Sequence, residues 1–337
     1  MNDAFSVTLL HWFSTHGRAL PWRETTDAYA IWLSEIILQQ TRVEQGRAYW
    51  HRFVQRFPDV ETLAAASEDD VLRLWQGLGY YSRARNLHAA ARQVVALGGF
   101  PRTLEGIRSL KGVGDYTAAA VASFAFNVPA AAVDGNVYRV LARHFGIDTP
   151  INSTEGKRVF TALANELLPV KQAGAFNQAM MDFGATLCTP RSPRCIDCPF
   201  AETCVALREG RVEALPVKLK RTMVRERRLA YIYIRCNGET AIHRRGAGDI
   251  WQGLWEPVAM EDVRCKREDG RGKRVVLLAK DVKHVLTHRI LLADFYLLET
   301  AERPALPPDY IWIPESQLDD YAKPRLIERL LEYLPQQ

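Results

Sequence analysis

A group of four closely spaced cysteines most restricts what this chain can fold into. Cys188, Cys195, Cys198 and Cys204 are separated by six, two and five residues. A proline-containing loop of this length can bring four thiolates around one metal centre, and cysteines are ligands of both structural zinc and iron–sulfur clusters. Zinc ribbons usually pair two C-x2-C knuckles, whereas this loop contains one. The spacing alone therefore predicts a metal centre and leaves zinc or an iron–sulfur cluster open.

The composition is that of a globular protein long enough for two domains. Of the 337 residues, 47% are hydrophobic and 25% are charged, and no low-complexity tract occurs. We expect a cytoplasmic protein without a membrane segment, because the N-terminus lacks a basic region followed by an apolar run and no long apolar stretch follows. Six cysteines in such a chain favour metal ligands or small buried residues over disulfides, with Cys236 and Cys265 standing alone. The net charge of +5 permits a polyanionic partner without requiring one.

The hydrophobic periodicity changes once along the chain. Up to about residue 210, apolar residues recur at three- and four-residue spacing, which predicts helices at 28–47, 63–77, 82–97, 116–126 and 137–145. From Leu229 the pattern becomes β-like, which predicts strands at 229–235, 275–278 and 289–298 before a final helix at 324–334. Residues 216–228 carry six basic residues against one glutamate. We interpret them as a linker, although an exposed basic helix or an edge strand also fits.

A second motif lies between two predicted helices. The sequence LKGVGDYT at 110–117 contains Gly112 and Gly114, which permit a tight turn whose backbone N–H groups can bind a phosphate. Asp134 follows in the sequence VDGNV and is placed to cap a helix that begins near Gly135. A carboxylate beside a helix N-terminus stays ionised and can stabilise positive charge on a sugar. Capping and catalysis are therefore compatible roles for Asp134.

The cysteine spacing, the glycine hairpin and VDGNV together resemble the signature of the endonuclease III superfamily of DNA glycosylases, a helix-hairpin-helix superfamily. The resemblance implies that the four cysteines bind a [4Fe–4S] cluster rather than zinc. Bifunctional members carry a lysine two residues past the second hairpin glycine, and this lysine attacks the sugar. Tyr116 occupies that position here, while Lys111 stands where the family usually has proline.

Tyr116 implies a monofunctional glycosylase. The alternative is a bifunctional pyrimidine-lesion glycosylase/AP lyase of the endonuclease III type. A non-catalytic DNA-binding iron–sulfur protein is a third possibility, against which the pair Glu35 and Asp134 argues.

A carboxyl group in the first long helix supplies the other half of the expected chemistry. Glu35 shares a helical face with Ile31, Trp32 and Leu38, so its pKa should be raised, unless it is a solvated surface glutamate. The segments PWR at 21–23 and IWLSEIILQQT at 31–41 resemble the first helices of adenine DNA glycosylases of the MutY type. This resemblance implies that Glu35 protonates a flipped-out adenine. Asp134 would stabilise or trap the oxocarbenium ion before water leaves an abasic site.

The same resemblance assigns further residues to the substrate. It implies that Tyr116 and Asn136 assist around the sugar and Asp134. The positions matched to substrate or DNA contacts are Arg23, Leu38, Gln40, Tyr80, Gly112, Gly114 and Gln178. Among them, Arg23 and Gln178 match the adenine pocket, and Gln40 and Tyr80 match side chains that the family inserts into the base stack.

The C-terminal region resembles a Nudix-like domain in residues 242–255, which end in WQGLW. Adenine DNA glycosylases use such a domain to read 8-oxoguanine opposite the adenine. The residues after Glu256 lack the carboxylate cluster that binds magnesium in Nudix hydrolases, so we expect no pyrophosphohydrolase activity. The lesion-reading loop, usually Phe-Ser-His, is matched by Leu286, Thr287 and His288, although an ordinary strand entry with an exposed histidine also fits.

The expected molecule is multidomain: an all-α helix-hairpin-helix glycosylase domain with a [4Fe–4S] cluster loop, followed by an α+β Nudix-like domain. The helical domain is expected at 1–212, with a six-helix lobe at about 21–133 and a cluster lobe at 1–20 and 134–212. A basic linker is expected at 213–228 and the Nudix-like domain at 229–337. We expect a cytoplasmic monomer, associated with the nucleoid when DNA-bound. It would remove adenine opposite 8-oxoguanine or guanine from double-stranded DNA in base excision repair.

Overall fold

The computed structural model describes residues 2–219, 225–263 and 275–335, so Cys265 lies outside the described residues. The chain forms two compact units. The first unit comprises Met1–Ala65 and Asn86–Lys220, and the second comprises Ala66–Arg85 and Arg221–Gln337. Within the described ranges, no helix is both long enough and apolar enough to cross a membrane.

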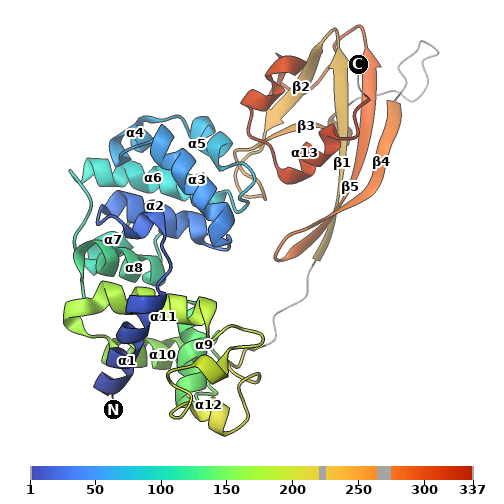
Figure 1. Ribbon diagram of the computed structural model, residues 1–337. Helices are drawn as coiled ribbons and strands as arrows, with labels where there is room; N and C mark the ends of the chain where they lie inside the picture. Colours follow the sequence, from blue (N-terminus) through green and yellow to red (C-terminus); the bar gives the residue numbers. More distant parts are fainter. Residues whose placement is uncertain (1, 220–224, 264–274, 336–337) are drawn as a thin grey trace. The chain divides into compact units, whose positions relative to one another are not determined.

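The first unit is built from helices joined by short loops (Figure 1). Its α-helices are α1 (Asn2–His16), α2 (Ala28–Leu38), α3 (Val43–Arg56), α4 (Val60–Ala65), α6 (Ser82–Ala96, from Asn86 onward), α7 (Leu104–Arg108), α8 (Asp115–Phe126), α9 (Gly135–Phe145), α10 (Thr154–Leu167), α11 (Ala173–Thr186) and α12 (Val205–Arg208). Short 3-10 turns occur at η1 (Pro21–Arg23), η2 (Val170–Gln172) and η3 (Cys195–Asp197).

Helix α2 is the centre of this unit. Each of its residues from Ala28 to Ile37 is buried, which is expected of a helix that is apolar on nearly every side. The carboxylate of Asp27 starts the helix by accepting hydrogen bonds from the backbone N–H groups of Tyr29 and Ala30. Helices α3 and α8 pack against α2, so a polar side chain on α2 enters the interior of the unit.

The sequence pattern predicts one helix over 28–47, and this prediction is wrong. The chain leaves the helical conformation after Leu38 and begins α3 at Val43. The C-cap residue Gln39 has an extended ψ of 115° and Gln40 then adopts a left-handed conformation with φ of 57°, so α2 ends without a glycine or proline. The helix predicted at 63–77 is likewise divided, because Ser67 caps a separate helix, α5 (Glu68–Trp75).

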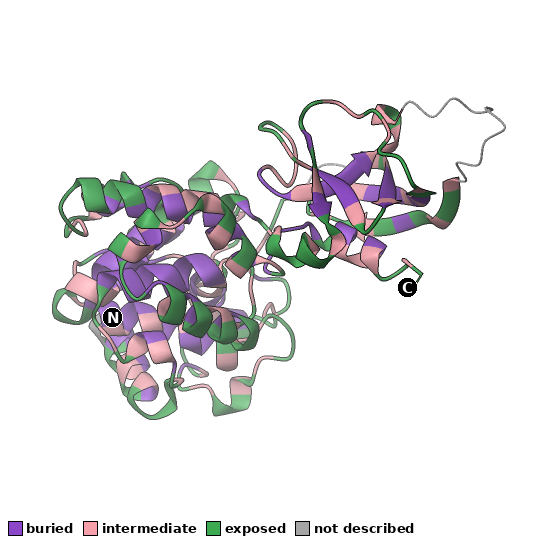
Figure 2. Ribbon diagram, turned by 90° about the horizontal axis from the view of Figure 1, so that it is seen from above, coloured by how far each residue is buried: buried purple, intermediate pink, exposed green. Residues whose placement is uncertain are grey.

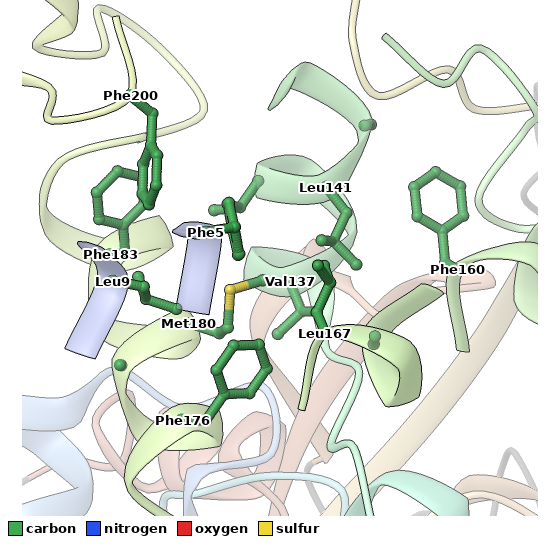
Figure 3. Packing of buried hydrophobic residues seen from close by; sticks show 14 of the residues in the cluster. Phe5, Leu9, Val137, Leu141, Phe160, Leu167, Phe176, Met180, Phe183 and Phe200 are labelled. Atoms are coloured by element: carbon green, nitrogen blue, oxygen red, sulfur yellow. The ribbon is translucent and has the colours of Figure 1, made fainter. Parts of the chain in front are cut away.

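A second apolar core lies among α1, α9, α10 and α11 (Figure 3). Figure 3 shows Phe5 and Leu9 of α1 close to Met180 and Phe183 of α11. Each fully buried side chain of this size contributes about 1.5–3 kcal/mol through removal of apolar surface from water. The partly buried Cys188, Cys198 and Cys204 pack against this core, so the cysteine loop is supported by the N-terminal helix as well as by its own neighbours in sequence.

The second unit contains a six-stranded mixed sheet in the order β4-β5-β1-β3-β2-β6. Its strands are β1 (Arg225–Cys236), β2 (Glu239–Arg244), β3 (Trp255–Ala259), β4 (Val275–Val285), β5 (Arg289–Thr300) and β6 (Tyr310–Pro314). The unit also contains α5, α13 (Arg325–Leu331) and the 3-10 turns η4 (Met260–Asp262) and η5 (Glu315–Asp320). Strands β1 and β5 are parallel along their whole length, and the other pairs are antiparallel.

The two faces of this sheet bury different residues, because successive side chains of a strand point to opposite sides. Tyr231 of β1 packs with Phe295 of β5 and with Leu326 of α13. The neighbouring Ile232 belongs to a separate core with Val258. In Figure 2 the buried segments run along the strands of the sheet and through the interior of the helical unit.

Strand β1 begins at Arg225, within the stretch 213–228 that the sequence analysis interprets as a linker. Residues Arg225 to Arg228 pair with Arg289 to Leu292 of β5. The basic side chains are matched by carboxylates, since Arg227 donates to Asp249 at 2.6 and 2.7 Å and Arg228 donates to Asp281 at 2.8 Å. Residues 225–228 therefore form part of a strand, which was one of the alternatives to a linker. Residues 220–224 lie outside the described residues.

Candidate active site

A cavity of about 410 Å³ in the first unit contains eight of the residues that the sequence analysis assigns to catalysis or substrate contact. Its walls come from η1, the C-terminal half of α2, the segment after α2, α8, the start of α9, and α11. The eight residues are Arg23, Glu35, Leu38, Gln40, Tyr116, Asp134, Asn136 and Gln178. Side chains from distant parts of the chain thus line a single space.

Glu35 is the buried acid of this cavity. Its residue exposure is 7%, and Ile31 and Trp32 on the same helix are more deeply buried. Burial raises the pKa of Glu35 to about 7, because the charged form loses water; the charge of Asp134 adds to the increase, while a hydrogen bond from Tyr116 and the charge of Arg23 oppose it. The apolar neighbours predicted this direction. The carboxyl group can therefore exchange a proton near neutral pH.

Tyr116 holds the carboxyl group of Glu35 in place. Its hydroxyl donates to Glu35 Oε2 at 2.7 Å from the first turn of α8. Burial and the nearby carboxylates of Glu35 and Asp134 raise the pKa of Tyr116 well above its ordinary value, so this hydroxyl remains a donor. The family resemblance implied a place for Tyr116 near the sugar and Asp134, whereas its hydrogen bond to Glu35 is visible only in the structure.

Asp134 is the N-cap of α9, as VDGNV predicted. Its Oδ1 accepts from the backbone N–H groups of Asn136 and Val137, each at 2.8 Å, and its Oδ2 accepts from Asn136 Nδ2 at 2.7 Å. Burial raises the pKa of Asp134, whereas these hydrogen bonds and the charge of Arg139 act in the opposite direction. The cap fixes the position of the carboxylate relative to the cavity.

A chain of hydrogen bonds runs from Asp134 to the cysteine loop. Asn136, which binds Asp134 Oδ2, accepts from Arg139 Nη2 at 2.9 Å. The same guanidinium donates to the carbonyl of Gly184 at 2.6 Å and, through Nε, to the carbonyl of Cys188 at 2.7 Å. Arg139 therefore joins the start of α9, the end of α11 and the first cysteine of the loop.

Arg23 lines the cavity and forms an ion pair with Asp182. Its Nη1 and Nη2 donate to the two carboxylate oxygens of Asp182 at 2.7 and 2.8 Å. Sequence reasoning assigned no role to Asp182. A signal was present, because Asp182 lies four residues after Gln178 and so shares its face of α11.

The glycine hairpin joins α7 to α8. Gly112 has φ of 75°, and a Cβ atom there would lie 2.6 Å from the Cβ of Asn86, so backbone conformation and packing both require glycine. Gly114 is the N-cap residue of α8 with φ of −95°, a conformation open to any residue. The turn leads into the helix that carries Tyr116.

The four cysteines of the loop line one small cavity together with Arg143. Burial raises the pKa of Cys198 to about 11, and it also raises the pKa values of Cys195 and Cys204. Arg143 Nη1 lies 3.4 Å from Cys188 Sγ. The donor set of four thiols fits an iron–sulfur cluster. Across residues 2–219, 225–263 and 275–335, no group of three or more His, Cys, Asp or Glu has the spacing for a single metal ion.

In the second unit, Tyr80 and Thr287 are in contact. Tyr80 lies in the turn after α5 with φ of 47° and is 52% exposed. Its hydroxyl is 2.6 Å from the hydroxyl of Thr287, in the exposed turn between β4 and β5. His288 in the same turn has an exposed side chain, and its carbonyl accepts from the backbone N–H of Arg225 at 3.3 Å. Two residues that the sequence assigned separately to DNA contacts thus lie side by side.

Two family models match separate parts of the chain. Residues 33–166 match the family model of the HhH-GPD superfamily of base excision DNA repair proteins, and residues 230–333 match the NUDIX domain model. An adenine DNA glycosylase of Buchnera aphidicola subsp. Schizaphis graminum is 33% identical over 345 residues, which cover 97% of this chain and 98% of that protein.

The chain belongs to the adenine DNA glycosylase family.

The adenine DNA glycosylase of Homo sapiens is 44% identical over 223 residues, covering 63% of this chain and 41% of the human protein. A solved structure of a thermostable thymine-DNA glycosylase is 33% identical with a TM-score of 0.58, and the match covers 62% of this chain and 97% of that one. The chain is thus an adenine DNA glycosylase of base excision repair, a hydrolase that acts on DNA. Its helix-hairpin-helix domain is followed by a Nudix-like domain, as the sequence predicted.

The hydrogen bond between Tyr116 and Glu35 gives a first prediction. Replacing Tyr116→Phe removes a donor that favours the ionised carboxylate, so the pKa of Glu35 should rise further above about 7. The pKa can be followed by NMR titration of the protein labelled with ¹³C at glutamate carboxyl carbons, with Glu35→Gln to assign the signal. Tyr138→Phe, on α9 and packed on Phe160, is the control and should leave this titration unchanged. An unmoved Glu35 titration in Tyr116→Phe would contradict the prediction.

Proposed function

We propose that this chain hydrolyses the N-glycosidic bond of adenine paired with 8-oxoguanine or guanine, without a lyase step. The observation that carries the proposal is the pair of carboxyl groups, Glu35 and Asp134, which line one cavity in different environments. Glycoside hydrolysis commonly uses two such groups with separate tasks. Glu35, buried on α2, is suited to donate a proton, and Asp134, the N-cap of α9, is suited to stabilise positive charge.

Glu35 is the general acid. An adenine flipped out of the duplex enters the cavity, and Glu35 protonates a ring nitrogen so that the base becomes a better leaving group. A group with a pKa of about 7 suits this role, because it is substantially protonated near neutral pH and still able to give up its proton. The hydrogen bond from Tyr116 to Oε2 orients the carboxyl group for this transfer.

Asp134 stabilises the positive charge that develops on the sugar. The two backbone N–H groups at the start of α9 and the amide of Asn136 hold its carboxylate, so it needs no rearrangement as the bond breaks. Burial raises the pKa of Asp134, and the positive charge of the oxocarbenium-like transition state beside it favours the ionised form. Water then completes the hydrolysis and leaves an abasic site.

The absence of an amine at position 116 supports a monofunctional reaction. A Schiff base with the sugar requires a nucleophilic amine, and the phenol of Tyr116 cannot form one. Lys111 lies before the hairpin turn, is exposed, and is not among the cavity-lining residues. A lyase step through the usual hairpin position is therefore not available to this chain.

Gln40 and Tyr80 are proposed to enter the base stack beside the flipped adenine. Both have left-handed backbone conformations and exposed side chains, with φ of 57° and 47°. Non-glycine residues rarely adopt this conformation, and such positions cluster at functional sites. The hairpin at Gly112 and Gly114 would hold a DNA phosphate at the start of α8. Arg23, Leu38 and Gln178 would contact the extruded base.

Cys188, Cys195, Cys198 and Cys204 would hold a [4Fe–4S] cluster. When bound, the cluster supplies a rigid charged centre that shapes the loop, and no step of base removal involves it. Arg143 braces the loop by donating to the carbonyls of Thr189 and Pro190 at 2.7 and 3.2 Å. Thr287 and His288, in the exposed turn of the Nudix-like unit, would read 8-oxoguanine in the opposite strand.

Adenine release from defined mispairs tests the proposal. Duplexes with adenine opposite 8-oxoguanine, adenine opposite guanine and thymine opposite guanine are incubated with the protein, and strand lengths are measured after alkali. We expect cleavage of the adenine strands only. Glu35→Gln and Asp134→Asn should each lower the single-turnover rate by about 10²-fold or more, because each removes one of the two charge-handling groups.

Two outcomes of this assay would overturn the proposal. Unchanged rates in Glu35→Gln and Asp134→Asn would exclude the mechanism. Borohydride trapping of a protein–DNA adduct at levels that match the activity would favour the bifunctional alternative, and release of thymine rather than adenine would change the substrate. Glu155→Gln, which removes a carboxylate paired with Arg158 on the surface of α10, is a matched control and should leave all rates unchanged.

The contact between Tyr80 and Thr287 predicts a role in lesion preference. Thr287→Ala removes a hydroxyl that can bond either Tyr80 or the opposite base, and a hydrogen bond of this kind contributes about 0.5–1.5 kcal/mol. Excision opposite 8-oxoguanine should therefore fall by up to about ten-fold relative to excision opposite guanine. Thr300→Ala, at the end of β5, is the control. An equal ratio of the two rates in Thr287→Ala and the parent protein would refute this role.

Metal analysis tests the cluster. The purified protein should contain about four iron atoms per chain, the number in one [4Fe–4S] cluster. Cys198→Ser should lose iron and bind mispaired duplex more weakly, because the loop loses its central support. Cys236→Ala removes a buried cysteine of β1 and should retain the iron. One zinc and no iron per chain would establish the zinc alternative instead.

A further inference from the structure

Asp182 of α11 has an unusual concentration of positive partners for one buried carboxylate. Its side chain has 0% exposure. Arg18 donates to it through the backbone N–H at 2.8 Å, through Nε at 2.9 Å and through Nη2 at 2.5 Å. Arg23 donates through Nη1 at 2.7 Å and Nη2 at 2.8 Å. Both arginines line the catalytic cavity, whereas Asp182 lies behind them and is not among its lining residues.

We propose that Asp182 is a positioning residue of the base pocket, which fixes the guanidinium of Arg23 at the pocket wall and offsets the effect of its charge on Glu35. The inference rests on the proposed function, because it assigns to Asp182 a part in keeping Glu35 ready to act as an acid.

The geometry restrains Arg23 on several sides. Its two terminal nitrogens bind the two oxygens of one carboxylate, an arrangement that sets the plane of the guanidinium. Nη1 also donates to the carbonyl of Arg18 at 3.0 Å, and the guanidinium lies 5.6 Å from the centre of the Phe13 ring. Asp182 therefore ties η1 to α11, the helix that also supplies Gln178 to the cavity.

The charges show why this carboxylate matters to the acid. The groups that act on Glu35 come from three elements: Tyr116 of α8, Asp134 at the start of α9 and Arg23 of η1. Of these, Arg23 opposes protonation of Glu35 by its charge, and Asp134 favours it. Two arginines share Asp182, so the group carries a net charge of +1. Without the carboxylate of Asp182, Arg18 and Arg23 would place a net charge of +2 at the cavity wall, near Glu35, which must hold a proton.

Asp182 itself remains ionised. Burial alone would raise the pKa of Asp182, but the hydrogen bonds from Arg23 and Arg18 outweigh burial and lower the pKa below its ordinary value. A carboxylate that stays charged throughout the working range of Glu35 provides a constant counter-charge. If Asp182 only held the two arginines in place, its hydrogen bonds would be sufficient and its negative charge would not be required.

The pH dependence of adenine release separates these two roles. The rate should fall as pH rises through the pKa of Glu35, since the protonated acid is the active form. In Asp182→Asn the amide keeps the size of the side chain and removes the charge, so Glu35 should lose its proton at lower pH. We expect the midpoint of the falling limb in single-turnover kinetics to move down by on the order of one unit. The rate well above that midpoint should fall about ten-fold, with little change well below it.

Arg23→Gln provides an independent arm if Asp182→Asn fails to fold. It removes the positive charge that opposes protonation and leaves Asp182 paired with Arg18, so the midpoint should move to higher pH. Combining Asp182→Asn with Arg23→Gln should return the midpoint toward that of the parent protein. Asp182→Glu, which retains the charge, should also keep the midpoint in place, and Glu155→Gln is the surface control.

The outcomes also distinguish this inference from the proposed function. If the parent protein releases no adenine from any mispair, the proposed function fails. If the parent protein does release adenine, and the decrease in rate at high pH disappears in Glu35→Gln, that decrease reports the titration of Glu35. A uniform loss of rate at every pH in Asp182→Asn, together with an unmoved midpoint in Arg23→Gln, would then overturn the positioning role and leave Asp182 as a structural brace.

Discussion

The burial of one carboxyl group in the largely apolar helix α2 sets the conditions for the rest of the site. Glu35 is enclosed because α2 packs against neighbours on nearly every side. Enclosure raises its pKa, and together with the opposing effects of the surrounding groups it gives a pKa of about 7. Tyr116 and Arg23 favour the ionised form, while Asp134 favours the protonated one. The acid is therefore governed by residues from η1, α8 and α9, and a change in any of these elements alters its chemistry.

The second carboxylate depends on a different kind of support. Asp134 is held by the start of α9, and Asn136 and Arg139 extend that support to the carbonyl of Cys188. The cysteine loop packs in turn on a core to which α1 contributes Phe5 and Leu9. Residues near the N-terminus thus stabilise a loop that is connected, through three hydrogen bonds, to the carboxylate of Asp134. This path consists of the side-chain amide of Asn136, the guanidinium of Arg139 and the backbone carbonyl of Cys188.

Local sequence patterns predicted the parts of the site that depend on near neighbours. Asp134 was recognisable as a cap because capping involves the next three residues, and Glu35 was recognisable as buried because its helical face is apolar. The break after Leu38 was not predictable, since no glycine or proline marks it and apolar residues resume at Val43. The partners of Asp182 were also hidden, because Arg18 and Arg23 lie in the segment after α1 and only the folded chain brings them to α11. Sequence thus identified the chemical groups, and tertiary packing determined how their charges are balanced.

The left-handed residue Gln40, which follows the end of α2, has a further consequence. A side chain at Gln40 is held in a backbone conformation that costs about 1 kcal/mol or more for a residue with a Cβ atom. Glycine would adopt the same turn without that cost, so the free protein sacrifices some folding stability to keep a long polar side chain there. In return, the direction in which this side chain leaves the main chain is set during folding. The entropy of fixing the backbone at this position is likewise lost at that stage.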